Sequence, residues 1–307
     1  MADGSSSPSR RPGSSEGPPR VVRTIAAWGL KRLLSWGRPQ REFTIFPGDR
    51  FLVSYPRSGN TWVRFLIANL MSPETPVTFT NIEDRIPDVY KNRRRQLDRV
   101  ARPRLLKSHE YFDPRYKSVI YIVRDPRDVV VSYYHYQLKA RFIEDGFPLD
   151  RYVTRFVSGE VDPYGSWGEH VASWLATRHE RREFLLLRYE DILDGAAREL
   201  DRVASFLNVR RTPEQLAEAV ERSSVDRLRM LEARESDEWV TTRGTRKDIP
   251  FIRTGARGGW RSVLSEHAVA QIESWWGPLM NTLGYDLTVA RVPDAGHRAQ
   301  TGDGLPP

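Results

Sequence analysis

The chain has 307 residues, 39% of them hydrophobic, which is enough for one large domain with its own core. It contains no cysteine, which excludes disulfide bonds and thiolate metal sites, and its six histidines show no close spacing typical of a zinc site. No apolar run approaches the ~20 residues of a membrane span, and the net charge of +8 suits an anionic partner as well as it suits a chain that is simply rich in arginine.

The two ends of the chain differ in composition from its centre. Residues 1–20 consist mainly of Ser, Pro, Gly and Arg, and we expect a disordered tail because they cannot bury an apolar face. Residues 21–45 form a connector whose first part, 21–37, mixes apolar residues with Arg and Lys. This pattern is typical of a first helix that packs on the domain, which we favour, and also of a basic amphipathic helix that makes a peripheral contact with an anionic membrane. Residues 46–290 are then the main domain, and residues 291–307 are a flexible tail.

From Phe51 onwards, short apolar runs alternate with helical patterns. Runs rich in β-branched residues are typical of the interior strands of a parallel sheet, and Asp125-Pro126 supplies an N-cap followed by proline at the first helical position. Strands that alternate with helices predict an α/β fold, with a central parallel sheet and helices on both faces. The predicted strands are 51–54, 104–107, 118–123 and 184–187, and the predicted helices are 61–70, 126–139, 167–178, 191–206, 213–221 and 267–283.

The segment 51–64 (FLVSYPRSGNTWVR) has the features of a phosphate-binding loop. A strand ends, a turn with proline and glycine follows, and a helix begins near Thr61, so that backbone amides and the hydroxyls of Ser58 and Thr61 converge on one point. Gly59 lets the backbone approach a ligand closely, and Arg57 can add charge-assisted hydrogen bonds. An ordinary strand-to-helix turn would explain the glycine, but not the arginine, the two hydroxyls and the tryptophan together. The dipeptide Gly-Lys occurs nowhere in the chain, so the loop lacks the Walker lysine and ATP hydrolysis is disfavoured.

Three blocks of the sequence resemble the nucleotide-binding segments of one enzyme family, the cytosolic sulfotransferases. Residues 55–62 (YPRSGNTW) are similar to the family's 5′-phosphosulfate loop, commonly YPKSGTTW, and residues 121–135 place Arg124 and Ser132 as its 3′-phosphate segment does. Residues 251–260 (FIRTGARGGW) resemble the loop RKGxxGxW, which closes over the same phosphate. The order and approximate spacing hold over most of the chain. On these blocks the chain is identified as a bacterial-type member of the family that uses 3′-phosphoadenosine-5′-phosphosulfate (PAPS).

The resemblance implies a P-loop-like fold and PAPS as co-substrate, with 3′-phosphoadenosine-5′-phosphate (PAP) as product. Two shorter matches support it, because residues 188–191 (RYED) carry the family's tyrosine beside adenine and Ser223-Ser224 stands at its Thr-Ser pair. A ligand with phosphates at both ends also needs two anion sites at one sheet edge, and the loops after the strands 51–54 and 118–123 offer them. The residues expected to bind PAPS are Arg57, Ser58, Gly59, Asn60, Thr61, Trp62, Arg124, Ser132, Tyr189, Ser223, Ser224, Arg253, Thr254 and Gly255.

The chemistry that the resemblance implies is transfer of a sulfonate to a hydroxyl or amine of a small-molecule acceptor by in-line displacement. His109 follows a predicted strand and matches the histidine of the family's Lys-[Thr/Ser]-His, which is the general base; an unperturbed pKa of ~6.5 suits that role. Lys107 and Arg57 are expected to stabilise charge on the bridging oxygen and on the leaving 5′-phosphate. No metal is expected, because these cations perform the neutralisation that magnesium performs in kinases.

The chain departs from the family pattern at three places. Arg57 replaces the usual lysine of the first loop and offers a planar fork in place of a mobile point charge. Thr254 stands where the family has lysine, which weakens the closing loop unless Arg257 compensates. The family's dimer motif would begin at Arg261, but Ser265-Glu266 occupies its Thr-Val position, so the dimer is not carried over and the oligomeric state stays open.

Two other functions stay open at this point. One is a P-loop kinase that uses ATP and magnesium, with Lys107 or Arg57 in the place of the Walker lysine. The other is a non-catalytic protein that binds nucleotides or polyanions on the same fold. We expect no nucleic acid partner, and we expect a cytoplasmic location because a reducing compartment fits the absence of cysteine. The acceptor itself is not specified, since the variable loops 75–102, 141–163 and 235–249 would form its pocket.

Overall fold

The computed structural model describes residues 42–253 and 255–288, all of which belong to one unit of the chain, Pro39–Pro307. The tails expected at 1–20 and 291–307 and the helix expected at 21–37 lie outside the described residues, as does Thr254. Within the described residues, no helix is long and apolar enough to cross a membrane.

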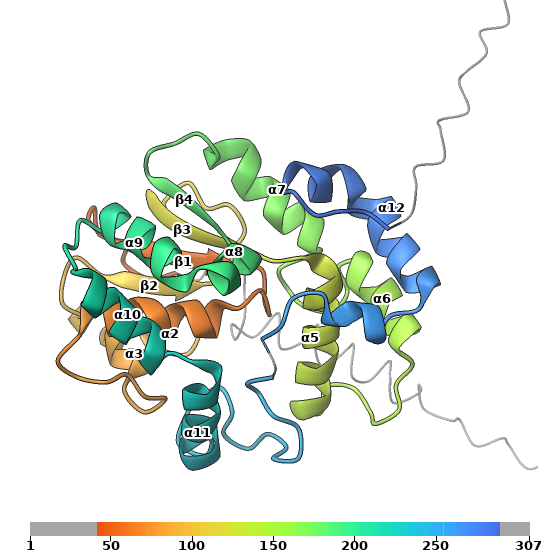
Figure 1. Cartoon of the computed structure of the whole chain (residues 1–307), viewed down its shortest axis with the longest axis horizontal. Coiled ribbons are helices and arrows are strands. Elements are labelled where there is room, and N and C mark those ends of the chain that lie inside the picture. Colours follow the sequence, from red (N-terminus) through yellow and green to blue (C-terminus); the bar gives the residue numbers. More distant parts are fainter. Residues whose placement is uncertain (1–41, 254, 289–307) are drawn as a thin grey trace, which may run out of the picture. The chain divides into compact units, whose positions relative to one another are not determined.

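Four parallel strands form the centre of the fold, in the order β2-β1-β3-β4 (Figure 1). They are β1 (Arg50–Ser54), β2 (Leu105–Ser108), β3 (Ser118–Val123) and β4 (Phe184–Arg188), each within one residue of its predicted ends. β1 pairs with both β2 and β3, so that Val53 lies opposite Ser108 on one side and Tyr121 on the other. The carboxyl ends of these three strands therefore meet at one edge of the sheet, where ligands bind in open α/β folds.

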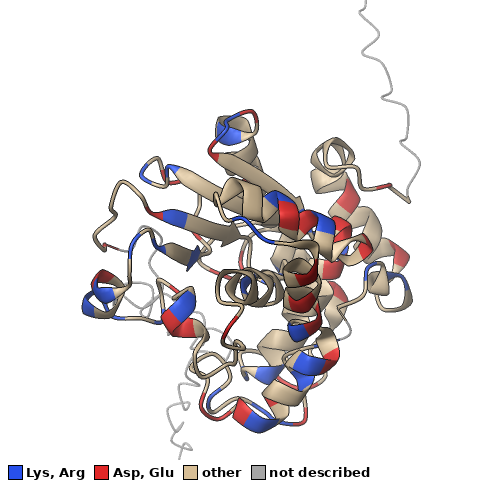
Figure 2. Ribbon diagram, turned by 60° about the vertical axis from the view of Figure 1, so that its left-hand side comes forward, with Lys and Arg blue, Asp and Glu red and all other residues tan. Residues whose placement is uncertain are grey.

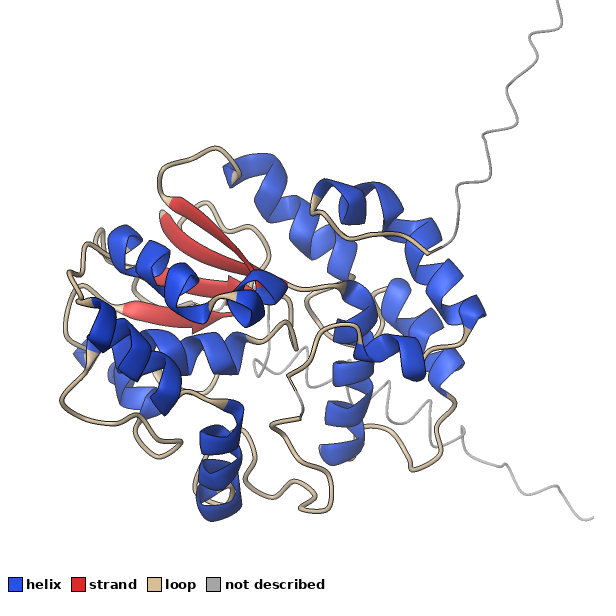
Figure 3. Cartoon of the chain, viewed as in Figure 1, coloured by secondary structure: helices blue, strands red, loops and turns tan. Residues whose placement is uncertain are grey.

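Helices cover both faces of the sheet, because successive strand residues point to opposite sides. In β1, Phe51 and Val53 belong to one buried cluster and Leu52 belongs to the other. The first cluster includes residues of α5 (Pro126–Lys139), α6 (Leu149–Val157), α7 (Trp167–Arg178) and α12 (Glu266–Thr282). The second includes residues of α2 (Asn60–Met71), α3 (Ile82–Arg85), α9 (Ala196–Phe206), α10 (Pro213–Arg222) and α11 (Val225–Glu235). Figure 3 shows the helices on either side of the strands, and the predicted fold class is confirmed.

The helix prediction is wrong at one place and incomplete at others. The single helix predicted at 191–206 is two helices, α8 (Tyr189–Asp194) and α9, because Gly195 takes φ −167° and ψ 68°, outside the helical region. The sequence pattern predicts neither α6 nor α11, although Ser224 marks the start of α11 by accepting a hydrogen bond from the amide of Arg227. It also omits the short helices α3 and α4 (Arg94–Arg99) and the 3-10 turn η1 (Gly259–Ser262).

The start of α5 is fixed by its predicted cap and by a buried charge network. The carboxylate of Asp125 accepts a hydrogen bond from the amide of Arg127 at 2.9 Å, and Pro126 occupies the first helical position. Arg127 is itself buried, and its Nη1 donates to Glu273 of α12 at 2.6 Å. Breaking a buried pair by removing one partner is strongly destabilising, so this network holds the end of β3 and the residue Arg124 in place.

Charged residues on the outside of the fold are largely intermixed. Figure 2 shows basic and acidic segments next to one another on the outer helices and loops. Pairs such as Arg246 with Asp145 and Asp248, or Arg222 with Glu218, join residues of opposite sign. Exposed pairs of this kind contribute little to stability, but they offset part of the net positive charge.

Candidate active site

The loop 55–59, which the sequence predicts to bind phosphate, joins β1 to α2 through two residues in the left-handed region. Arg57 has φ 67° and Gly59 has φ 94°, and Gly59 is the N-cap of α2. No side chain caps this helix and its first turn has no acidic residue, so the amides of residues 60–62 have no partner within the helix. The hydroxyl of Ser58 is buried and has no hydrogen-bond partner in the described part of the chain. Such amides and such a hydroxyl suit the oxygens of a phosphate or sulfate group.

Gly59 is required by space as well as by conformation. A Cβ atom at this position would lie 2.3 Å from Cδ2 of Tyr189, the first residue of α8. The Tyr189 ring also meets the Trp62 ring edge-on, with 5.4 Å between centroids, and its hydroxyl donates to the carbonyl of Gly255 at 2.8 Å. Tyr189 thus connects the first loop to the closing loop. With Trp62 it provides the aromatic surface that a nucleotide base requires.

Arg124 follows β3 at the same edge of the sheet. Its guanidinium lies 4.2 Å from the centroid of the Tyr189 ring, and its Nη2 donates to the carbonyl of Ala256 at 3.1 Å. Its Nε is buried and has no partner among the described residues. Burial, and then the charge of Arg124, lower the pKa of Arg253, so the two guanidinium groups repel one another. An anion bound between them would relieve this repulsion and satisfy the buried donor.

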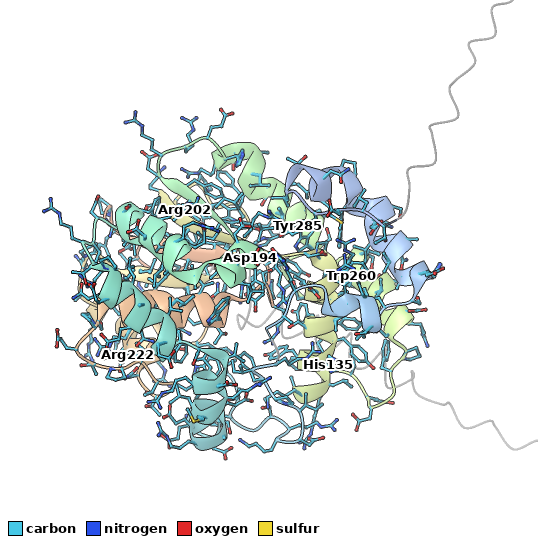
Figure 4. All side chains as sticks on the ribbon, viewed as in Figure 1. His135, Asp194, Arg202, Arg222, Trp260 and Tyr285 are labelled. Carbon is cyan, nitrogen blue, oxygen red and sulfur yellow. The ribbon has the colours of Figure 1, made fainter. Side chains whose placement is uncertain are left out.

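The closing loop 251–260 is held to the start of α5 by Asp128. The Asp128 carboxylate accepts hydrogen bonds from the amides of Gly258, at 2.7 Å, and Trp260, at 3.1 Å. Trp260, labelled in Figure 4, lies on η1, and the guanidinium of Arg127 is 4.2 Å from the centroid of its ring. Asp128 lies inside the second sequence block, but the resemblance assigned it no role. Its place in the first turn of α5 explains why it reaches the loop.

Arg257 is the residue that could compensate for Thr254 in the closing loop. Its Nη1 donates to Asp194 at the end of α8, at 2.6 Å. Both side chains are more than half exposed, so the pair is a surface contact. Figure 4 labels Asp194, at the end of α8.

Arg57 connects two of the segments that are predicted to bind the anionic groups of the nucleotide. Its Nε donates to Oγ of Ser132 at 3.3 Å, and its Nη2 donates to the carbonyl of Phe251 at 3.4 Å. The guanidinium lies 4.5 Å from the centroid of the Phe251 ring and 4.9 Å from that of Tyr136. Burial lowers the pKa of Arg57 to about 10, which leaves it a cation at neutral pH. The structure thus brings together two residues, Arg57 and Ser132, that the sequence assigned to opposite ends of the nucleotide.

Ser223 and Ser224 have structural partners. The hydroxyl of Ser223 is fully buried, donates to the carbonyl of Ala219 at 2.8 Å and accepts from Nδ2 of Asn69 at 3.0 Å. Its carbonyl accepts a hydrogen bond from the indole of Trp62 at 2.9 Å, while Ser224 caps α11. Ser223 therefore fixes the orientation of Trp62. A nucleotide contact through either hydroxyl stays a prediction.

His109 follows β2, and the neighbouring strand fixes its tautomer. Its Nδ1 lies 2.7 Å from the carbonyl oxygen of Ser54. A carbonyl can only accept, so Nδ1 carries the proton and Nε2 keeps its lone pair. Burial, and then the charge of Lys107, hold the pKa of His109 well below its usual range, so the ring is neutral at pH 7. The hydroxyl of Ser54 also accepts from Nδ2 of Asn60 at 3.1 Å, which connects the histidine to the first loop.

Lys107 is buried and ion-paired. Its Nζ donates to Oδ2 of Asp88 at 2.8 Å. Burial lowers the pKa of Lys107, and the carboxylate of Asp88 opposes that effect. No sequence motif pointed to Asp88, because a single aspartate in a loop carries no local signal.

Two tyrosines that the sequence analysis did not single out border His109. The Tyr90 ring is nearly parallel to the imidazole, at 7° and 6.5 Å between centroids, and the Tyr164 ring lies 5.9 Å away. Tyr164 is buried and belongs to the connection between α6 and α7, whereas Tyr90 lies between α3 and α4. Tyr90 lies in the predicted variable loop 75–102, and Tyr164 directly follows the loop 141–163.

Most of the predicted site residues lie at the carboxyl edge of the sheet, on the loops that follow β1, β2, β3 and β4 and on the closing loop. Thr254 is outside the described residues, and Ser223 is committed to protein partners. Within 42–253 and 255–288, no group of three or more His, Asp or Glu side chains is placed to hold a metal ion.

Comparison with known proteins identifies the family. The pattern of the family described as "Sulfotransferase domain" matches residues 47–284. The 3-beta-hydroxysteroid sulfotransferase of Cavia porcellus is 30% identical over 251 residues, which cover 76% of this chain and 83% of that protein. Sulfotransferase 1A1 of Bos taurus is 31% identical over 252 residues, covering 76% of this chain and 83% of that protein.

Solved structures share the fold. Retinol dehydratase in complex with retinol and PAP has a TM-score of 0.68 and 21% identity, covering 81% of this chain and 85% of that chain. A mouse sulfotransferase complexed with PAP has a TM-score of 0.61 and 22% identity, covering 84% of this chain and 90% of that chain. At these identities the likeness concerns the fold. The family pattern and the relatives, which extend over more than two thirds of the chain, show that this protein belongs to the PAPS-dependent sulfotransferase family, as its motifs predicted.

Proposed function

We propose that this sulfotransferase moves the sulfonate of PAPS to a hydroxyl or amine of a small-molecule acceptor, with His109 as the general base. The observation that carries the proposal is the 2.7 Å contact between Nδ1 of His109 and the carbonyl of Ser54. It leaves Nε2 as the unprotonated nitrogen of a neutral ring, which is the form that can take a proton. The ring stands at the sheet edge where the anion-binding groups gather.

The groups that lack partners within the protein support PAPS as the donor. Oγ of Ser58 and Nε of Arg124 are buried and have no hydrogen-bond partner in the part of the chain that the structure describes. We propose that Ser58, Thr61 and the first amides of α2 bind the 5′-phosphosulfate. Arg124 and Ser132, with Arg253, would bind the 3′-phosphate. Trp62 and Tyr189 meet edge-on at 5.4 Å between centroids, and we propose that adenine contacts this aromatic pair.

The residues of the site divide the chemical step among them. A bond forms between the acceptor oxygen or nitrogen and sulfur, and the bond between sulfur and the 5′-phosphate oxygen breaks. His109 takes the acceptor's proton at Nε2. Lys107 and Arg57 stabilise the negative charge that grows on the leaving oxygen, so that PAP departs as an anion balanced by protein cations.

The surroundings of the base favour an acceptor with an apolar ring system. Tyr90 and Tyr164 present aromatic rings within 6.5 Å of the imidazole centroid. The relative from Cavia porcellus is named as a sulfotransferase for a 3-beta-hydroxysteroid, which is a hydroxyl on apolar rings. We propose this class of acceptor, and simple phenols, as the first to test.

The test is incubation of the full-length protein with labelled PAPS and a panel of phenols, hydroxysteroids and amines, with product detection by mass spectrometry. His109→Ala should lower turnover by the ~10²–10⁴-fold typical of a lost general base, while PAP affinity in calorimetry barely changes. The matched control is His179→Ala, because His179 is the C-cap of α7 and precedes β4, at the amino edge of the sheet and away from His109. The control should retain nearly full turnover.

Near wild-type turnover of His109→Ala would remove this residue from the mechanism. Magnesium-dependent transfer of phosphate from ATP, without any sulfonated product from PAPS, would replace the proposed function with that of a kinase.

A further inference from the structure

Backbone contacts with residues 87–89, outside β2, also hold Lys107 in place. The amide of Lys107 donates to the carbonyl of Pro87 at 2.9 Å, and the amide of Val89 donates to the carbonyl of Lys107 at 3.1 Å. These two bonds form a parallel bridge that sets Asp88 directly opposite Lys107. The side chains then meet at 2.8 Å, with only 10% of the lysine side chain and 6% of the aspartate side chain exposed.

Asp88 is itself immobilised by its neighbours. Its Oδ1 accepts a hydrogen bond from the amide of Tyr90 at 2.8 Å, and its own amide donates to Oε2 of Glu83 at 2.9 Å. Glu83 is in turn paired with the buried Arg64 at 2.9 Å. One carboxylate oxygen of Asp88 is thus used to fix the carboxylate, and the other is left for Lys107.

The group of side chains around Asp88 also lies next to His109, the proposed base. The Tyr90 ring is stacked with the imidazole of His109, and its centroid lies 5.6 Å from Nζ of Lys107. Burial raises the pKa of Asp88, but the charges of Lys107 and Arg64 outweigh it and hold the value at about 2. Asp88 therefore stays an anion throughout the pH range in which enzymes are assayed.

The charge of Asp88 raises the pKa values of both Lys107 and His109. Burial lowers the pKa of Lys107, as do the nearby cations Arg64 and Lys91, and Asp88 raises it. Burial, Lys107 and His170 lower the pKa of His109, and Asp88 together with the Ser54 carbonyl raises it. Without Asp88, the lysine would lose its proton at a lower pH and the histidine would be a weaker base.

We propose that Asp88 is a positioning residue for sulfonate transfer, whose carboxylate fixes the ammonium of Lys107 beside His109 and keeps it charged. The inference rests on the proposed function, since it assigns Asp88 a part in the step that Lys107 and His109 perform. Asp88 itself touches neither the acceptor nor the donor in this account. It acts through the position and charge of Lys107, and its own charge also raises the pKa of His109.

A second buried pair offers a matched control. Arg104 and Asp49 are joined by a bidentate contact, with Nε to Oδ1 at 2.9 Å, and both side chains are almost fully buried. They precede β2 and β1, so they lie at the amino edge of the sheet, away from His109. A purely structural effect of losing a buried carboxylate should be as large in Asp49→Asn as in Asp88→Asn.

The experiment is the pH profile of kcat for full-length Asp88→Asn, Asp88→Glu and Asp49→Asn, with PAPS saturating and an acceptor that the wild type sulfonates. In Asp88→Asn the acid limb of the profile should move to lower pH because the pKa of His109 falls. The alkaline limb should also move to lower pH because the pKa of Lys107 falls. The alkaline limb should move by ~1–3 pH units, so the deficit in kcat grows as pH rises. The KM for PAPS should change little, and Asp88→Glu should restore part of the alkaline limb. Asp49→Asn should leave both limbs in place.

A profile of Asp88→Asn parallel to that of the wild type would overturn the proposal, even if kcat were lower throughout. If Asp88→Asn does not fold, Lys107→Met is compared with the double variant Asp88→Asn/Lys107→Met, which removes both partners of the pair together. Equal alkaline parts of the two kcat profiles, with the acid limb at lower pH in the double variant, would support the proposal, and a difference between their alkaline parts would refute it. Absence of any sulfonated product from the wild type would instead refute the proposed function, and this inference with it.

Discussion

The two ends of the central sheet both hold buried arginines, and they use them differently. At the amino end, Arg104 donates to Asp49 and to two backbone carbonyls at distances of 2.7 to 2.9 Å. At the carboxyl end, Arg124 donates to the carbonyl of Ala256 at 3.1 Å, and its Nε has no partner in the part of the chain that the structure describes. The first guanidinium is paired directly with a carboxylate. The second has the cations Arg57 and Arg253 as well as the carboxylates of Asp128 and Glu190 in its surroundings.

The difference separates scaffold from binding site. Buried polar groups in proteins are normally satisfied, so an arginine whose donors are all used contributes to stability. An arginine with a donor left over, among other cations, is arranged for an anionic ligand. Arg57 belongs with the second kind, because its bonds to Ser132 and to the carbonyl of Phe251, at 3.3 and 3.4 Å, are long enough to be exchanged for stronger ones.

The largest loss of stability is expected from a substitution at the amino end of the central sheet. Arg104→Ala leaves the buried carboxylate of Asp49 without its partner, which should lower the free energy of unfolding by ~3–5 kcal/mol. Chemical denaturation monitored by fluorescence would measure it. In protein that remains folded, PAP affinity should match that of the wild type. A loss below about 1 kcal/mol, or a selective loss of PAP binding, would break the distinction between the two ends.

Arg124→Ala should weaken PAP binding more than it lowers stability. Its removal relieves repulsion with Arg57 and Arg253 but also loses attraction to Asp128, so the free energy of unfolding should change by less than the ~3–5 kcal/mol expected for Arg104→Ala. PAP binding should weaken by ~2–5 kcal/mol, because a charged group of the ligand loses its partner, while ADP binding is nearly unchanged. Calorimetry with both ligands gives the comparison. Equal losses for PAP and ADP would mean that Arg124 does not bind the 3′-phosphate.

Local sequence motifs were sufficient to predict the parts of the structure that depend on contiguous residues. The run 118–123 predicts β3 to the residue, because β-branched and apolar side chains continue through it, and Asp125-Pro126 marks the start of α5. The first loop places Ser58 and Gly59 as its motif predicted, at a turn that needs a left-handed glycine. These features depend on neighbours in the sequence.

Residues that meet only in the folded chain could not be found in this way. Asp88 precedes Lys107 by 19 residues and lies in a loop without periodicity, so nothing local indicates the pair. The break at Gly195 has a similar cause, since an isolated glycine within a helical pattern is compatible with either one helix or two. The contact of residues 21–37 with the domain stays a prediction, with a membrane contact as its alternative. The cytoplasmic location also stays a prediction, and the oligomeric state stays open.

The central claim, that two anion sites at one sheet edge bind PAP at both ends, is tested most directly by calorimetry on the wild-type protein. PAP and ADP share the adenosine, but only PAP carries the 3′-phosphate that Arg124 and Ser132 are proposed to bind. The two titrations must be run at one ionic strength, because exposed charges are screened by salt. PAP should bind at least ~30-fold more tightly than ADP, which corresponds to ~2 kcal/mol, and should need no magnesium. Equal affinities, or magnesium-dependent binding of ATP stronger than that of PAP, would contradict the account.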